Sequence, residues 1–222
     1  MRAKGSPLPI LFTFVVVDLL GYSLILPLLP YYAKTFSATP FVIGLLGTAN
    51  ALAQVIAAPF IGRLSDRFGR RPLLLLGTFA GFGCFLMLGF ARSLAMIFAS
   101  RIINGLLGGN LALAQAYITD VTEEKDRAKS LGIIGSAFGI GFIVGPAMGG
   151  FLASFGYGTP ALVAAGLALM NFTWILAALP ESLSAERRAA LAILARGQTE
   201  PPAGCALRPR QPHRSVATRG TS

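Results

Sequence analysis

Six runs of mainly apolar residues, each long enough to cross a bilayer, most constrain what this chain can fold into. A membrane-spanning helix needs about 20 such residues, because the hydrocarbon core of a bilayer is about 30 Å thick. The chain is 54% hydrophobic and only 13% charged, whereas soluble domains carry about 25% charged residues. The sequence therefore predicts an all-α polytopic membrane protein with spans at residues 8–29, 42–61, 73–91, 94–118, 131–153 and 160–180.

The basic residues predict the orientation of these spans. With the N-terminus inside, the inner segments carry Arg2, Lys4, four arginines in residues 62–72, Lys125, Arg127, Lys129, Arg187 and Arg188, and the outer loops carry Lys34 and Arg92. Lysine and arginine favour the cytoplasmic side, so we expect a multi-pass protein of the cell membrane with both termini cytoplasmic. The net charge of +10 lies in short loops and in the tail, which argues against a nucleic-acid partner.

An internal repeat divides the predicted bundle. A shift of 87 residues without gaps aligns Pro59 with Pro146, Gly62 with Gly149, Phe68 with Phe155 and Gly69 with Gly156. The interval holds three spans, so the second copy is inverted in the membrane, as in many secondary transporters. The alternative is a chance alignment of glycines in a glycine-rich chain.

Beyond the spans the pattern changes. We predict a six-helix transmembrane domain over residues 1–182 and a disordered cytoplasmic tail over residues 183–222, where proline, arginine, glycine, serine and threonine dominate. Cys84 and Cys205 lie in an apolar span and in the tail, and neither has metal-ligand spacing. No metal, no cofactor and no catalytic residue is expected, because the sequence lacks a nucleophile triad and a phosphate loop.

Polar residues inside the spans are the candidate site. Asp18 lies midway along the first span, where a carboxylate costs about 2.5–3.5 kcal/mol on insertion scales. A carboxyl group that takes up and releases a proton suits a proton-carrying or cation-recognising role, and the alternative is a structural hydrogen bond to a neighbouring helix.

Two further groups predict a polar cavity between the first, second and fourth spans. Arg101, Asn104 and Gln115 share a stripe with small residues at spacings of three and four. Asn50 and Gln54 form a similar pair in the second span. The alternative is hydrogen bonding between helices without transport.

The fifth span carries the glycine-rich segment GSAFGIGFIVGPAMGG. Gly141, Gly145 and Gly149 recur every four residues and predict a smooth face for close helix packing. Pro146 removes a backbone hydrogen bond and predicts a bend near the outer end of the helix, and Gly150 ends the segment. This face is expected to act as a rocking seal or as plain tight packing.

These segments, taken with the charged stretch GRLSDRFGRRP between the second and third spans, resemble the major facilitator superfamily, and in particular its drug:proton antiporters. GRLSDRFGRRP (residues 62–72), RIING (101–105) and GFIVGPAMGG (141–150) stand in the order of that family's signatures, and residues 8–182 fit its pattern. The stretch DLLGYSLILPLLP resembles the first helix of tetracycline exporters.

The resemblance implies proton-coupled efflux of small lipophilic or drug-like compounds by alternating access between two six-helix halves. It implies that Asp18 is a substrate or proton site and that Arg101 supports proton coupling. It also implies a cytoplasmic conformational latch made of Gly62, Asp66, Arg67, Gly69, Arg70 and Arg71.

Because the family has twelve helices, this chain is interpreted as the N-terminal half, with a tail that indicates a truncated or frame-shifted end. Its expected partners are membrane lipid, a small-molecule substrate, and a second six-helix half or a second copy. The rival hypothesis is a membrane assembly protein, or an inactive fragment, that does not transport.

Overall fold

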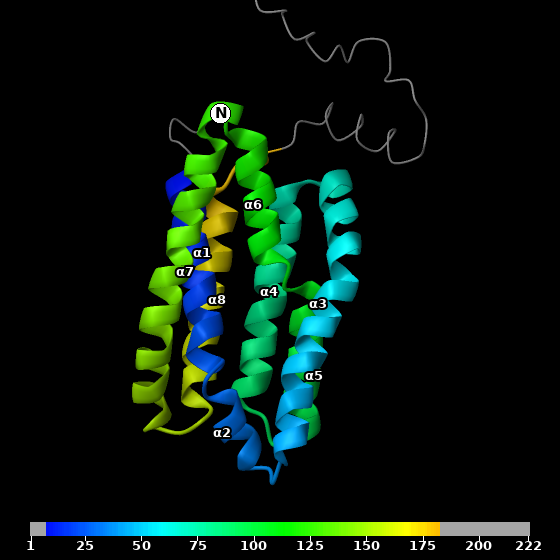
Figure 1. The fold of residues 1–222 in the computed structure, drawn as a ribbon, viewed down its shortest axis with the longest axis vertical. Helices are drawn as coiled ribbons and strands as arrows, with labels where there is room; N and C mark the ends of the chain where they lie inside the picture. The colour runs from blue at the N-terminus through cyan, green and yellow to red at the C-terminus, as the bar shows by residue number, and fades with distance from the viewer. Residues whose placement is uncertain (1–7, 183–222) are drawn as a thin grey trace, which may run out of the picture.

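The computed structural model describes residues 8–182, which form an upright bundle of helices (Figure 1). The helices are α1 (Leu8–Ile25), α2 (Leu29–Lys34), α3 (Pro40–Phe68), α4 (Arg70–Gly89), α5 (Leu94–Leu107), α6 (Asn110–Val121), α7 (Glu124–Ala153) and α8 (Thr159–Ala178). The predicted tail, residues 183–222, lies outside the described residues.

The prediction of six membrane-spanning helices is confirmed. Within residues 8–182, six helical stretches are long and apolar enough to cross a bilayer, with α1 and α2 forming one stretch and α5 and α6 another. Many large apolar side chains on α3 and α7 are exposed, among them Phe41, Val55, Ile143 and Phe151. Such faces suit a hydrocarbon solvent rather than water.

Residues 62–72, which lie between the predicted second and third spans and were not expected to be helical, belong to two helices. Helix α3 continues to Phe68, and α4 begins at Arg70 after the single residue Gly69. The 29 residues of α3 span about 44 Å at 1.5 Å per residue, which exceeds the hydrocarbon thickness of about 30 Å. The charged residues therefore fit the overhanging helix ends, and only Gly69, with φ of 106°, makes the turn.

The fourth predicted span is not continuous. Helix α5 ends at Leu107, and α6 begins at Asn110, so Gly108 and Gly109 interrupt the helix. Glycine is the residue least favourable to a helix interior after proline, by about 1 kcal/mol relative to alanine, and two in succession explain the break.

The inverted repeat is visible in the helices. The shift of 87 residues brings α3 onto α7 and α4 onto α8, and in each copy a proline, Pro59 or Pro146, lies inside the helix. Helices α3 and α7 run in opposite directions (Figure 1). Among the described residues, Gly69 and Gly156 are the glycines with positive φ, at 106° and 124°. The aligned glycines therefore share a backbone conformation that other residues rarely adopt.

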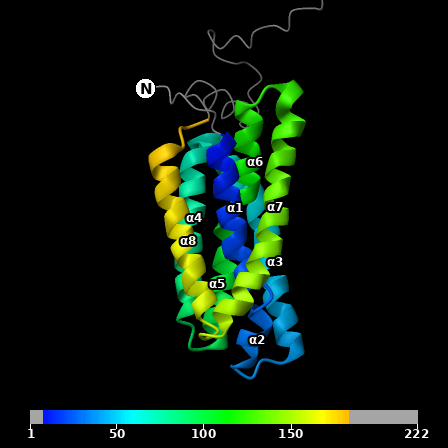
Figure 2. The ribbon, with the colours of Figure 1, turned by 90° about the vertical axis from the view of Figure 1, so that its left-hand side faces the viewer.

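Packing follows the same symmetry. In the repeat, α1 corresponds to α5 and α7 corresponds to α3. Helix α1 packs most closely on α7, and the corresponding pair, α5 and α3, also packs together. Helix α4 packs on α8, its counterpart in the other repeat. Figure 2 shows α1 between α7 and α8. One buried apolar cluster, including Leu11, Phe14 and Tyr117, lies towards one end of α1, and another, including Leu24 and Phe85, lies towards the other end. The polar side chains of the candidate site lie between the two clusters.

Candidate functional site

A central cavity of about 230 Å³ lies between the helices. Its polar lining is Asp18 and Tyr22 from α1, Gln54 from α3, Thr78 from α4, Asn104 from α5 and Asn110 from α6. Its apolar walls include Phe85, Phe138 and Phe142. The cavity thus combines one carboxyl group with aromatic and amide side chains, a composition suited to a partly apolar ligand.

Asp18 has a partner that the sequence did not indicate. Nδ2 of Asn110 donates a hydrogen bond to Oδ1 of Asp18 over 2.8 Å. Asn110 is only 6% exposed and is the first residue of α6, so the Gly108–Gly109 break determines where its side chain lies. A continuous helix over residues 94–118 would put Asn110 on a different face from Arg101, Asn104 and Gln115, so the predicted stripe did not include it. The Gly108–Gly109 pair directly before Asn110 is the sequence feature that could have indicated a break there.

Arg101 is buried, with 4% of its surface exposed, and it is not among the residues that line the central cavity. Its Nε donates to Oγ of Ser100 over 3.5 Å, and its Nη2 is buried without a hydrogen-bond partner. The backbone carbonyl of Arg101 accepts a hydrogen bond from Nδ2 of Asn50 over 2.7 Å. Asn50 therefore joins α3 to α5.

The predicted polar residues are only partly brought together. Gln54 and Asn104 line the cavity with Asp18, whereas Gln115 lies on an exposed face of α6 and its backbone carbonyl accepts from the Thr119 hydroxyl over 2.8 Å. The break between α5 and α6 rotates Gln115 out of the stripe that a continuous helix would have formed. Of the six candidates, Asp18, Gln54 and Asn104 thus line the cavity, Asn50 and Arg101 lie in the contact between α3 and α5, and Gln115 is exposed.

A second cavity, also of about 230 Å³, extends along α3 and α6. It shares Gln54, Gly108 and Leu111 with the central cavity and reaches Ser65 and Arg70 at the arginine-rich end. Small residues such as Gly62 and Gly105 line it. The linings of the two cavities together therefore reach from Asp18 to Arg70.

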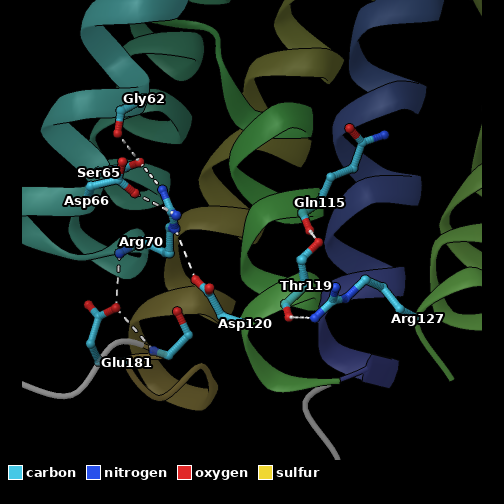
Figure 3. Close-up of polar contacts among 10 residues, drawn as sticks. Gly62, Ser65, Asp66, Arg70, Gln115, Thr119, Asp120, Arg127 and Glu181 are labelled. Atoms are coloured by element: carbon cyan, nitrogen blue, oxygen red, sulfur yellow. Dashed lines mark hydrogen bonds and ion pairs between the residues drawn. The ribbon is translucent and has the colours of Figure 1, made fainter. Parts of the chain in front are cut away.

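Arg70 ties four segments together, and we refer to its contacts as the Arg70 network (Figure 3). Nη2 lies 2.7 Å from Oδ1 of Asp66, Nε lies 3.1 Å from Oδ2 of Asp120, and Nη1 donates to the Ser65 hydroxyl. The backbone N–H of Arg70 donates to Oε1 of Glu181 over 2.9 Å. The network joins α3, α4, α6 and the residues immediately after α8.

The other residues of the 62–72 stretch differ in their contacts. Arg71 donates from Nη2 to the carbonyl of Leu176 over 2.7 Å, while Arg67 is exposed and lies over the ring of Phe68 at 5.3 Å. A Cβ at Gly69 would lie against the Glu181 carboxylate, and a Cβ at Gly62 would meet nothing within 4 Å. Gly69 is thus required by the backbone and its neighbour, whereas Gly62 faces open space.

The glycine face of α7 packs directly on α1. Gly141, Gly145 and Gly149 are buried, and the Ser23 hydroxyl donates to the carbonyl of Gly141 over 2.7 Å. A Cβ at Gly141 would lie 2.9 Å from Cβ of Leu19, and one at Gly145 would overlap Ser23. The partner surface is therefore the stretch of α1 directly after Asp18.

Pro146 and Gly150 lie on the exposed side of α7, away from this contact. Among residues 8–182, no group of three or more histidine, cysteine, aspartate or glutamate side chains lies close enough together to hold a metal ion.

Comparison with known proteins places these features in a family. Residues 11–216 match the family model described as Major Facilitator Superfamily, a match that extends past the described helices. The chain is 37% identical over 171 residues to the class B tetracycline resistance protein of Escherichia coli, covering 76% of this chain and 43% of that protein. It is 36% identical over 180 residues to multidrug resistance protein 2 of Bacillus subtilis, covering 81% of this chain and 45% of the relative.

A solved structure agrees with the sequence relatives. The human organic anion transporter MFSD10 superposes with a TM-score of 0.71 at 30% identity, covering 82% of this chain and 49% of that one. The chain thus spans about half the length of the relatives that it matches.

Proposed function

The chain belongs to the major facilitator superfamily, and we propose that it takes part in proton-coupled efflux of small lipophilic or drug-like compounds by alternating access. The observation that carries the proposal is the position of Asp18, a carboxyl group in a central cavity whose walls include the aromatic rings of Phe85, Phe138 and Phe142. Such a cavity offers apolar contact to a lipophilic compound and one group able to hold either a proton or a cationic centre. The names of the relatives, which concern tetracycline and multidrug resistance, support the same class of substrate.

The other candidate residues take roles around Asp18 in this proposal. Gln54 and Asn104 contact the substrate, Arg101 supports proton coupling from behind the cavity, and the Arg70 network acts as the latch. The glycine face of α7 against α1 acts as the seal that rocks during the transport cycle. No cofactor takes part, since the proton gradient drives the cycle, and the chain has no enzymatic role.

The proposal includes a membrane setting. The lysine and arginine distribution supports insertion in the cell membrane with both termini cytoplasmic. Because the relatives are about twice as long as the matched region, transport is proposed for this six-helix unit together with a second six-helix half or a second copy.

The test is proton-driven transport of a lipophilic cation in reconstituted vesicles. Asp18→Asn is compared with Asp126→Asn, a matched change of an exposed acid at the start of α7. We expect Asp18→Asn to abolish the proton-dependent component and Asp126→Asn to retain it. Equal transport by both variants would remove Asp18 from the mechanism. Transport by neither variant nor the parent, alone or with a second half, would favour the non-transporting assembly role.

A further inference from the structure

The side chain of Asn110 is buried but only half satisfied. Its Nδ2 donates to Asp18, while its Oδ1 is buried with no hydrogen-bond partner. Buried amide oxygens in proteins are nearly always hydrogen-bonded, and an exception calls for an explanation. Because Asn110 is 6% exposed, solvent outside the bundle does not supply the missing donor.

The surroundings of the unpartnered oxygen are specific. A Cβ built at Gly77 of α4 would overlap Oδ1 of Asn110 and would lie 2.9 Å from the carbonyl oxygen of Leu107. Two acceptor oxygens therefore face the same small space beside Gly77. Leu107 is the last residue of α5, so its carbonyl belongs to the helix end that the Gly108–Gly109 break creates.

We propose that Asn110 is a positioning residue that hydrogen-bonds Asp18 in both of its protonation states by rotating its amide through a half turn. This inference rests on the proposed function, in which Asp18 binds a proton. With Asp18 ionised, Nδ2 donates to the carboxylate as observed. With Asp18 protonated, the rotated amide presents Oδ1 as the acceptor of the carboxyl O–H.

The rotation also removes the mismatch beside Gly77. It exchanges an acceptor for an NH₂ donor at nearly constant volume, because the amide oxygen and nitrogen are similar in size. The NH₂ group then faces the Leu107 carbonyl, and the amide bridges Asp18 and the end of α5. Proton uptake by Asp18 would thereby strengthen the junction between α5 and α6. The proton ends on the Asp18 carboxyl oxygen, and no covalent bond of Asn110 changes.

Few other charged groups face this site. Tyr22 of α1 is the other titratable residue of the cavity lining, and α3, α6, α7 and α8 contribute only uncharged lining side chains. Arg101 of α5 is not among the residues that line this cavity. The Asn110 amide is therefore the lining group that responds most directly when Asp18 gains or loses its proton.

Infrared difference spectroscopy between low and high pH tests the inference on the full chain in lipid vesicles, and it needs no transport. The carboxyl C=O band of protonated Asp18 is identified by its loss in Asp18→Asn. With ¹⁵N-labelled asparagine, we expect an isotope-sensitive amide change that titrates with this band and is lost in Asn110→Leu. The Asp18 band should also be displaced in Asn110→Leu. An Asp18 band without a coupled amide change overturns the inference and leaves the proposed function standing, whereas no Asp18 band at any pH overturns both.

A second pair of variants leaves the side chains of Asp18 and Asn110 unchanged. Gly77→Ala puts a methyl group where Oδ1 and the Leu107 carbonyl lie, whereas Gly81→Ala, one turn later on α4, adds a methyl group with no atom within 4 Å. Gly81 also lines the central cavity, so it is a matched control. We expect Gly77→Ala to displace the Asp18 band and to suppress the coupled amide change, and Gly81→Ala to preserve both. Identical spectra for the two variants would overturn the proposal.

Discussion

Asp120 and Asp66, two of the three acids of the Arg70 network, are predicted to differ sharply in their contributions to stability. Asp120 is 11% exposed and Arg70 is 12% exposed, with Nε and Oδ2 3.1 Å apart. A hydrogen bond to a charged group in such a setting contributes about 1.5–3 kcal/mol. Asp66 is 44% exposed and lies on α3, across the Gly69 turn from Arg70, and an exposed ion pair contributes about 0.2–1 kcal/mol. Asp120→Asn should therefore lower the free energy of unfolding several-fold more than Asp66→Asn.

Unfolding of the chain in mixed micelles measures both effects, with the fluorescence of Trp174 on α8 as the probe. Arg70→Gln in each background completes a double-mutant cycle, so the Arg70–Asp120 and Arg70–Asp66 terms are obtained separately. Asp126→Asn is the control for loss of an exposed acid. The cycle should give a coupling energy above about 1.5 kcal/mol for Asp120 and below about 1 kcal/mol for Asp66.

The same variants separate stability from the latch. Asp66→Asn should insert and fold like the parent yet reduce transport once a second half is present, because the proposed role of Asp66 is to bias one conformation. Unchanged transport by Asp66→Asn would reduce Asp66 to an exposed ion pair. If Asp66→Asn instead destabilises the bundle as much as Asp120→Asn, then side-chain exposure does not determine how much each ion pair contributes to stability.

Two pairs of glycine substitutions test the helix packing and the backbone turn. Gly145→Ala should destabilise the bundle by about 1–3 kcal/mol through overpacking, because its Cβ would overlap Ser23. Gly139→Ala on the same helix, with open space around its Cβ, should leave stability unchanged or raise it by up to about 1 kcal/mol. Unfolding in micelles compares the two variants. Gly69→Ala should cost about 1 kcal/mol or more, because its φ is positive, and Gly62→Ala in open space should not. Equal melting temperatures within either pair would contradict the close packing at Gly145 or the backbone requirement at Gly69.

The sequence predicted the parts of the fold that depend on apolar length. Six spans follow from the thickness of the bilayer, and the repeat follows from aligned prolines and glycines that other residues replace poorly. The Arg70 network was only partly predictable, since Asp66 and Arg70 lie only four residues apart in the sequence, whereas Asp120 and Glu181 reach Arg70 from 50 and 111 residues away. Contacts at such separations depend on how the helices pack, which no local pattern specifies.

The site around Asp18 was harder to predict for a different reason. The stripe through Arg101 and Gln115 assumed a continuous helix, but α5 ends before Gly108 and α6 buries Asn110, Leu113 and Tyr117 in place of that stripe. The break moves Gln115 to an exposed face and brings Asn110 to Asp18. A single irregularity of the backbone thus decides which amide reaches the carboxyl group, and periodicity arguments fail at such a position.

The two turns related by the repeat show how the ends of the bundle differ. Gly69 and Gly156 share a positive φ, but a Cβ at Gly69 would meet the Glu181 carboxylate, whereas a Cβ at Gly156 would meet only the Thr159 hydroxyl at 3.6 Å. The first turn is bonded to a residue 111 positions away, and the second contacts the start of the helix that it introduces. The backbone geometry is therefore common to both repeats, while the charged contacts occur at one end. Because charge and not backbone separates the two ends, substitutions that neutralise Asp66 or Asp120 should alter the arginine-rich end alone and leave the turn at Gly156 intact.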